Sequence, residues 1–94
     1  MSARYAFSKS LKEVRFLFCH TSSHSDATRV FLKRAYPTMK RNNPFTPVLM
    51  REALDIEPRV FARYEFGKER QESLAGLTQK EIEAKVTDLV KAAS

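Results

Sequence analysis

The sequence predicts an α/β fold: a four-stranded mixed sheet with two main helices, in the order β-α-β-β-β-α. Two stretches, residues 13–20 and 59–66, alternate along the chain in the way of strands. Two other stretches, residues 26–41 and 78–93, repeat their apolar residues at helical spacing. The first helix lies between two predicted strands, and a crossover of that length joins parallel strands, so the sheet is mixed.

The first predicted strand covers residues 13–20. Val14 and Phe16 point to one face, and Leu17 and Cys19 point to the other. Since both faces are apolar, we expect a central strand that is covered on both sides.

A helix is predicted over residues 26–41. Its apolar stripe is Ala27, Val30, Phe31, Ala35 and Met39. Pro37 lacks the N–H that would bond to residue 33 and clashes with that carbonyl, so we expect a kink or a break there. Residues 42–44, two asparagines and a proline, end the helix.

Residues 46–52 are predicted to form the second strand, parallel to the first in a right-handed βαβ unit. The third strand covers residues 59–66 and is half exposed, with Gly67 at its end. A short fourth strand near residues 71–74 completes a hairpin.

The last helix has the clearest signals. Thr78 and Glu81 form a capping box, and Leu77 and Ile82 occupy the two positions of a hydrophobic staple. The stripe that faces the sheet is Ile82, Val86, Leu89, Val90 and Ala93. The whole order fits a minimal thioredoxin-like sandwich; a ferredoxin-like layout is the competitor, but it requires a helix between different strands.

Length and charge limit the function. The 94 residues suffice for one small domain, which excludes a separate cofactor domain. The net charge is +6, and residues 1–51 carry ten basic and two acidic side chains. We therefore expect a negatively charged partner, which leaves nucleic acid, an anionic membrane surface and an acidic protein open. No apolar run is long enough to span a membrane.

We divide the chain into a basic N-terminal segment, residues 1–12, and a single domain, residues 13–94. The segment contains basic, serine and aromatic residues and no acid, a bias typical of mitochondrial import sequences. A disordered basic tail explains the same composition equally well.

The sequence offers few candidates for chemistry. Cys19 is the only cysteine, so no internal disulfide or cysteine-rich zinc finger exists. Cys19 to Ser22 has the C-x-x-S spacing of a monothiol glutaredoxin, but the predicted helix starts too far away to stabilise a thiolate, so we expect a buried thiol. Cys19, His20 and His24 match no closed zinc pattern. We predict no catalytic, cofactor-binding or metal-binding residue and no small-molecule substrate.

The remaining candidates are partner-binding residues. Arg29 and Lys33 share a helix face with Lys40, and the strand over residues 59–66 combines arginines with aromatic residues. The predicted set is Arg29, Lys33, Arg51, Arg59, Arg63, Tyr64 and Phe66. A solvated helix face and a wet strand face explain these residues about equally well. No exposed aromatic row suited to base stacking is predicted, which disfavours nucleic acid.

Three stretches together resemble a known family: LKEVRFLFCH (residues 11–20), RVFLKRAYPTMKRNNPFTPVLMRE (29–52) and IEPRVFARYEFGKE (56–69). They are similar to the small thioredoxin-like accessory subunits of mitochondrial respiratory complex I, the NADH:ubiquinone oxidoreductase. The most specific matches are Asn43, Pro44, Pro47, Arg51 and Glu52, then Pro58, Ala62, Arg63, Tyr64, Phe66 and Gly67.

This resemblance implies a non-catalytic subunit without iron–sulfur cluster, flavin or quinone. It implies a peripheral position on the matrix side of the mitochondrial inner membrane, docked on other complex I subunits, in particular the large iron–sulfur subunit. Some relatives have a second cysteine where this chain has Ala53, so a redox pair with Cys19 is absent here. Pro58 matches the cis-proline of thioredoxins, and its isomer is left open.

Two alternatives remain open beside this interpretation. Some mitochondrial ribosomal proteins share the domain, so one alternative is an RNA-binding protein of the same fold. The other is a monothiol redox protein that uses Cys19.

Overall fold

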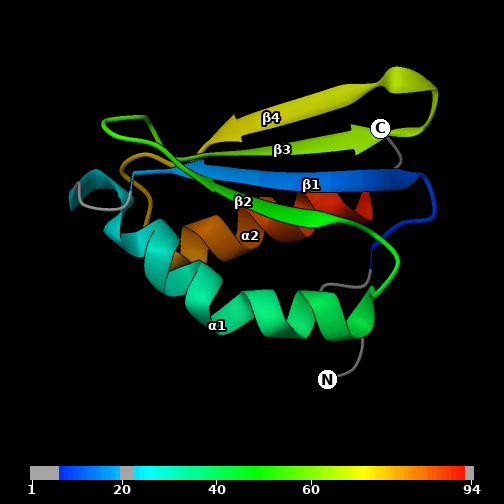
Figure 1. Ribbon diagram of the computed structural model, residues 1–94, viewed down its shortest axis with the longest axis horizontal. Coiled ribbons are helices and arrows are strands. Elements are labelled where there is room, and N and C mark those ends of the chain that lie inside the picture. The colour runs from blue at the N-terminus through cyan, green and yellow to red at the C-terminus, as the bar shows by residue number, and fades with distance from the viewer. Residues whose placement is uncertain (1–6, 20–22, 93–94) are drawn as a thin grey trace.

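The chain folds into one mixed sheet and two helices, as predicted (Figure 1). The computed structural model describes residues 7–19 and 23–92. The elements are β1 (Leu11–Phe18), η1 (Ser23–Ser25), α1 (Asp26–Asn42), β2 (Val48–Glu52), β3 (Arg59–Tyr64), η2 (Glu65–Gly67), β4 (Glu69–Ser73) and α2 (Gln79–Lys91).

The sheet has the strand order β2-β1-β3-β4. β1 is parallel to β2 and antiparallel to β3, and β4 is antiparallel to β3. β1 is therefore central, as predicted, and α1 links two parallel neighbours. The topology is compatible with the predicted thioredoxin-like fold.

Both helices lie on the same face of the sheet, where they contact each other (Figure 1). The expectation that β1 is covered on both sides is therefore wrong. On the face away from the helices Leu17 is only half-buried, next to a half-buried Arg15. This face is therefore a surface of mixed polar and apolar residues, and Leu17 does not belong to a second core.

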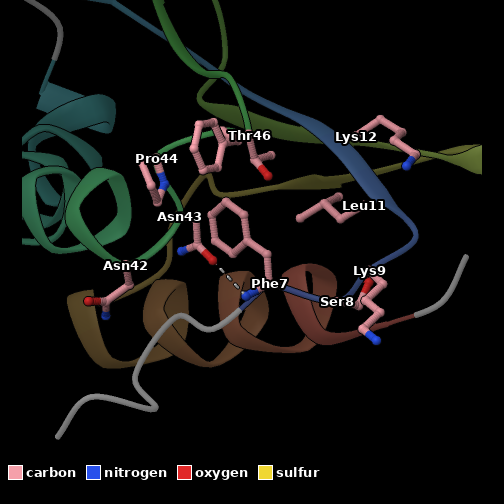
Figure 2. Close-up of a pocket in the computed structure, with 10 residues that line it drawn as sticks. Phe7, Ser8, Lys9, Leu11, Lys12, Asn42, Asn43, Pro44 and Thr46 are labelled. Carbon is pink, nitrogen blue, oxygen red and sulfur yellow. Dashed lines mark hydrogen bonds between the residues drawn. The ribbon is translucent and has the colours of Figure 1, made fainter.

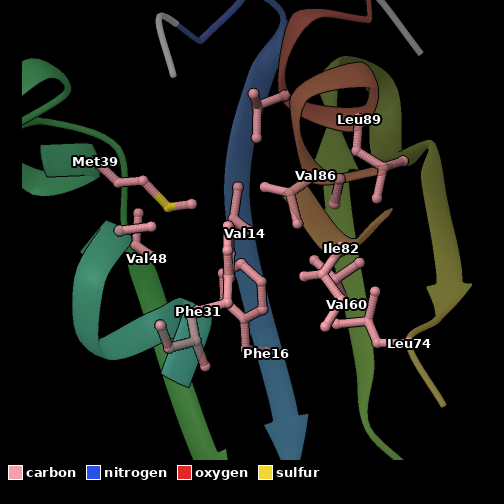
Figure 3. Packing of buried hydrophobic residues seen from close by; sticks show 14 of the residues in the cluster. Val14, Phe16, Phe31, Met39, Val48, Val60, Leu74, Ile82, Val86 and Leu89 are labelled. Carbon is pink, nitrogen blue, oxygen red and sulfur yellow. The ribbon is translucent and has the colours of Figure 1, made fainter. Parts of the chain in front are cut away.

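The core lies between the sheet and the two helices (Figure 3). Val14 and Phe16 of β1 are fully buried, and the ring of Phe16 lies 6.5 Å from the ring of Phe31 on α1. Ile82 and Val86 of α2 pack against the same cluster. Burying a side chain of this size contributes about 1.5–3 kcal/mol, so this single core stabilises the fold.

α1 runs continuously through Pro37 for 17 residues, so no break occurs; the ribbon bends along its length (Figure 1). Its buried residues are Thr28, Phe31, Leu32, Ala35 and Met39. The predicted stripe was wrong at Val30, which is half exposed, and it missed Leu32. The buried set follows the i, i+3, i+4, i+7 rule more closely, with one polar threonine in it.

Several predicted boundaries were displaced. β1 begins at Leu11, two residues early, and the backbone N–H of Ser8 donates to the Val90 carbonyl oxygen (2.8 Å). β3 ends at Tyr64 instead of Phe66, because Phe66 (φ 65°) and Gly67 (φ 74°) turn the chain into β4.

The capping box at the start of α2 is confirmed. The Glu81 N–H donates to Thr78 Oγ1 (3.3 Å), and the Thr78 N–H donates to Glu81 Oε1 (2.9 Å). Such caps contribute about 1 kcal/mol and fix where the helix begins. The stripe of α2 is buried as predicted from Ile82 to Val90, and Ala93 lies outside the described residues.

Candidate interaction surfaces

The sheet face that carries no helix is the first candidate surface, and we call it the open sheet face. Strand alternation and register place its side chains. Its residues are Glu13, Arg15 and Leu17 of β1, Leu49 and Arg51 of β2, Arg59, Phe61 and Arg63 of β3, and Glu69, Gln71 and Ser73 of β4. Three of the predicted partner residues, Arg51, Arg59 and Arg63, thus share one surface.

An ion network crosses this face. Glu13 pairs with Arg63 (2.9 Å) and also lies 3.5 Å from Arg15 Nε. Arg15 extends to Glu69, at 3.9 Å, and so links β1 to β4. Exposed pairs of this kind contribute about 0–1 kcal/mol each, but several in a row hold the long side chains in place.

Arginine also lies over an aromatic ring on the open sheet face. The guanidinium carbon of Arg15 is 5.6 Å from the centre of the Phe61 ring. Next to it, Arg59 donates to Gln71 Oε1 (2.8 Å) and pairs with Glu57 (3.1 Å). Arg15 and Phe61 were absent from the predicted set, although the register makes them direct cross-strand neighbours. The alternation of each strand places them on a face, but only the strand order brings them together.

The two predicted residues on α1 have different surroundings. The Arg29 guanidinium donates to the Cys19 carbonyl oxygen (2.6 Å) and pairs with Asp26. Arg29 thus ties the end of β1 to the start of α1. Lys33 is exposed on the same helix. Lys33 therefore remains a surface candidate, whereas Arg29 has a structural role.

The prediction of Tyr64 as a partner residue is wrong. Its side chain is 1% exposed, and its hydroxyl donates to the Leu89 carbonyl oxygen (2.6 Å). Burial raises the pKa of the Tyr64 phenol above its usual 10.0, and the Arg70 guanidinium opposes this shift. Phe66, by contrast, is 94% exposed at the tip of the β3–β4 hairpin, whereas Arg59 lies at the other end of β3. The alternation of β3 turns Tyr64 to the core. Phe66 would follow it there if the strand continued, but β3 ends at Tyr64 and the turn with φ 65° at Phe66 leaves that side chain exposed.

Cys19 is buried, as predicted. Its thiol sulfur accepts a hydrogen bond from the Asp55 N–H (3.3 Å), and its own N–H donates to Ser25 Oγ (3.0 Å). A thiol without exposure is a poor nucleophile toward a substrate in solution. The peptide bond before Pro58 is trans, so Pro58 does not have the cis isomer of the thioredoxin proline that it matches in position.

Two further predictions concern metals and membranes. His20 lies outside the described residues, so the interpretation of Cys19, His20 and His24 as a non-metal cluster is not tested. Within residues 7–19 and 23–92, no three His, Cys, Asp or Glu side chains gather in a way that would hold a metal ion. Among the same residues, neither helix has the length and apolar character of a membrane span.

A pocket of about 350 Å³ lies where the N-terminal segment crosses the loop between α1 and β2 (Figure 2). The N–H of Phe7 donates to Asn43 Oδ1 (3.1 Å) and closes one side. Lys9 and Lys12 line the pocket, and its described lining residues include no carboxylate, histidine or cysteine. No sequence motif pointed to this pocket, because it forms between segments far apart in the chain.

A second, more apolar pocket of about 310 Å³ lies between α1 and β2, and we call it the α1–β2 groove. Its lining residues are Phe18, Arg29, Leu32, Lys33, Tyr36, Pro37, Met50 and Glu52. The described residues thus form a small two-layer α/β domain whose candidate sites are the open sheet face and two shallow pockets.

Comparisons with known proteins agree with this class. A family model for the mitochondrial ribosomal protein L51 / S25 / CI-B8 domain matches residues 28–79. The NADH-ubiquinone oxidoreductase 10.5 kDa subunit of Neurospora crassa is 59% identical over 97% of both chains. NADH dehydrogenase [ubiquinone] 1 alpha subcomplex subunit 2 is 42% identical in Arabidopsis thaliana, over 97% of this chain and 94% of the relative. The subunit of the same name in Mus musculus is 36% identical, over 77% of this chain and 73% of the relative.

The chain therefore belongs to the L51/S25/CI-B8 family, and within it to the subunits of NADH-ubiquinone oxidoreductase. The resemblance noted from the sequence is confirmed.

Proposed function

We propose that this chain is an accessory subunit of mitochondrial respiratory complex I that binds other subunits and has no reaction of its own. The observation that carries this proposal is the identity of 59%, over nearly the whole of both chains, with a subunit of NADH-ubiquinone oxidoreductase. The relatives in a plant and a mouse also carry the name of an NADH dehydrogenase subunit. Its place is then the mitochondrial inner membrane, peripheral and on the matrix side.

The open sheet face is the proposed docking surface. Arginine and aromatic residues are preferred anchors of protein interfaces, and Arg15, Arg59, Arg63 and Phe61 lie together there. The ion network holds the arginines in place, so binding immobilises few further rotamers. The large iron–sulfur subunit is the proposed neighbour.

The charges of the open sheet face indicate which kind of partner it binds. Glu13, Glu57 and Glu69 lie among its arginines, so the face is close to balanced rather than strongly basic. A balanced face suits a protein surface of mixed charge, whereas a polyanion requires a continuous basic stripe. This supports a protein partner over RNA.

Sedimentation tests the proposal. A tagged chain is expressed in cells of the organism that produces this protein. Mitochondria from these cells are solubilised in detergent and run on a sucrose gradient before and after ribonuclease treatment. We expect the chain to sediment with NADH-dehydrogenase activity and to stay there after the treatment. A chain that sediments with ribosomal particles, and leaves them when RNA is digested, favours the RNA-binding alternative that the family name contains.

A further inference from the structure

The edge strand β2 exposes an unusual amount of apolar surface. Of the six large hydrophobic side chains that are exposed among the described residues, four lie in residues 45–54: Phe45, Leu49, Met50 and Leu54. Leu49 and Met50 point to opposite faces of the sheet, and each is 46% exposed. Exposed apolar residues in such number on one segment indicate a surface that another molecule covers.

Within residues 7–19 and 23–92, no strand pairs with the outer side of β2. β2 is the first strand of the sheet, and Figure 1 shows no strand of the described chain beyond it. The Pro47 carbonyl accepts from the Val14 N–H (3.0 Å), and the Ala53 N–H donates to the Phe18 carbonyl (3.1 Å). In a parallel pair, alternate residues bond to the neighbouring strand.

The odd-numbered residues of β2 therefore pair with β1. The peptide groups of Val48, Met50 and Glu52 point outward and can accept a further strand. Exposed edges are normally protected by charge, by proline or by a bulge. The first three residues of β2, 48–50, are apolar and carry none of these.

We propose that β2 pairs with an extended segment of another complex I subunit, which adds a fifth strand to the sheet. This inference rests on the proposed function and specifies how the partner binds. Addition of a strand gives affinity through main-chain hydrogen bonds and specificity through side-chain pockets. The edge is continuous with the open sheet face, since Leu49 and Arg51 belong to both.

The two sides of β2 define the chemistry of that segment. On the helix side the added strand passes the α1–β2 groove, whose walls include Leu32, Tyr36 and Met50, so apolar side chains fit there. On the other side its residues lie beside Leu49 and the exposed Arg51. The fitting segment has about five residues, with apolar and acidic side chains in alternation.

A proline placed at either of two neighbouring positions tests the pairing. Met50→Pro removes an outward N–H and leaves the β1–β2 bonds intact, a position where edge strands tolerate proline. Leu49→Pro removes an inward N–H and serves as the fold-breaking comparison. Val30→Gln, on α1 and outside the lining of the α1–β2 groove, serves as the matched control for loss of an exposed apolar side chain. The full-length variants are expressed in cells that lack the native chain.

We expect Met50→Pro to melt within a few degrees of the wild type and to fall about tenfold in incorporation into complex I, because a backbone bond and an apolar contact are both lost. Val30→Gln should incorporate normally. Normal incorporation of Met50→Pro overturns the edge inference alone, whereas a wild-type chain that is absent from complex I overturns the proposed function.

Hydrogen exchange of the unmodified chain settles the matter if Met50→Pro fails to fold. In the free chain the amides of Val48, Met50 and Glu52 should exchange fast and those of Leu49 and Arg51 slowly. In purified complex I all five should be slow. Equally fast exchange of the Met50 and Glu52 amides in the free chain and in complex I overturns the inference. A free chain that is a dimer, and that becomes a monomer on Met50→Pro, also overturns it, because the β2 edge then pairs with a second copy of this chain.

Discussion

At the scale of single residues, Tyr64 links the sheet to α2. Its hydroxyl donates to the Leu89 carbonyl across the core, and burial raises the pKa of the phenol. The neutral phenol is therefore the form that the fold favours. The stability it contributes is complete below about pH 10 and is lost as the pH rises through the raised folded pKa.

Tyr64→Phe should lower the free energy of unfolding by about 1 kcal/mol at pH 7, the value of one hydrogen bond. The difference between wild type and variant should shrink above pH 10, because only the wild type has this phenol to ionise. Urea unfolding from pH 7 to pH 11 measures both quantities. A difference that stays constant across this range contradicts the role assigned to the buried hydroxyl.

Arg29 and Lys33 lie on the same helix but have different roles: Arg29 stabilises the fold, and Lys33 is an exposed surface cation. Arg29→Met should destabilise the fold by about 1 kcal/mol, because it removes a charged donor from the Cys19 carbonyl. Lys33→Met should change stability by less than about 0.5 kcal/mol. Thermal melting of the two variants, which lose the same charge, checks this; equal effects on stability would remove the distinction.

At the scale of elements, most of the fold could be predicted because its signals are local. The capping box of α2 and the alternation of β1 lie within a few residues, and both elements were found. The end of β3 was missed because the turn at Glu65 depends on a distant partner, the Ser10 carbonyl, which accepts the Glu65 N–H (2.9 Å). Pro37 misled for a similar reason, since packing on the sheet outweighs the local cost of a proline inside α1.

β1 and β3 together carry the network proposed for docking. Arg63→Glu places a carboxylate against Glu13, and Arg59→Glu places one against Glu57. Either reversal should reduce incorporation into complex I at least about tenfold, while the melting temperature stays within a few degrees, because exposed pairs contribute little to stability. Blue-native gels of mitochondria from complemented cells give the measurement.

Lys80→Glu on α2 is the control for the charge reversals, since it makes the same change in net charge on the helical side of the molecule. Incorporation of Arg63→Glu at the level of Lys80→Glu would move the docking surface away from the open sheet face.

At the scale of the whole molecule, the candidate site was only partly predictable. Arg51, Arg59 and Arg63 were identified by residue type, but Arg15 and Phe61 join them only through the strand order and register. Tyr64 was misassigned because residue type alone does not separate an interface tyrosine from a buried one. The N-terminal segment was assigned outside the domain, yet Phe7 and Ser8 contact α2 and the loop after α1.

The small size of the chain fits a docking role. Its accessible surface is 5719 Å², and a standard interface covers about 800 Å² per partner, so one interface occupies about a seventh of it. The helices bury one face of the sheet and leave the other face and the β2 edge for contact. A two-layer domain of this size therefore has a large exposed surface that is available for binding a partner.

Hydroxyl-radical footprinting of purified complex I tests the central claim most directly. The claim predicts that the chain is present in the complex and that oxidation of Phe61 and Leu17 falls several-fold relative to the free chain, while solvent-facing residues of α2 keep their reactivity. A chain that is missing from the complex, or a Phe61 oxidised equally in both states, would contradict it.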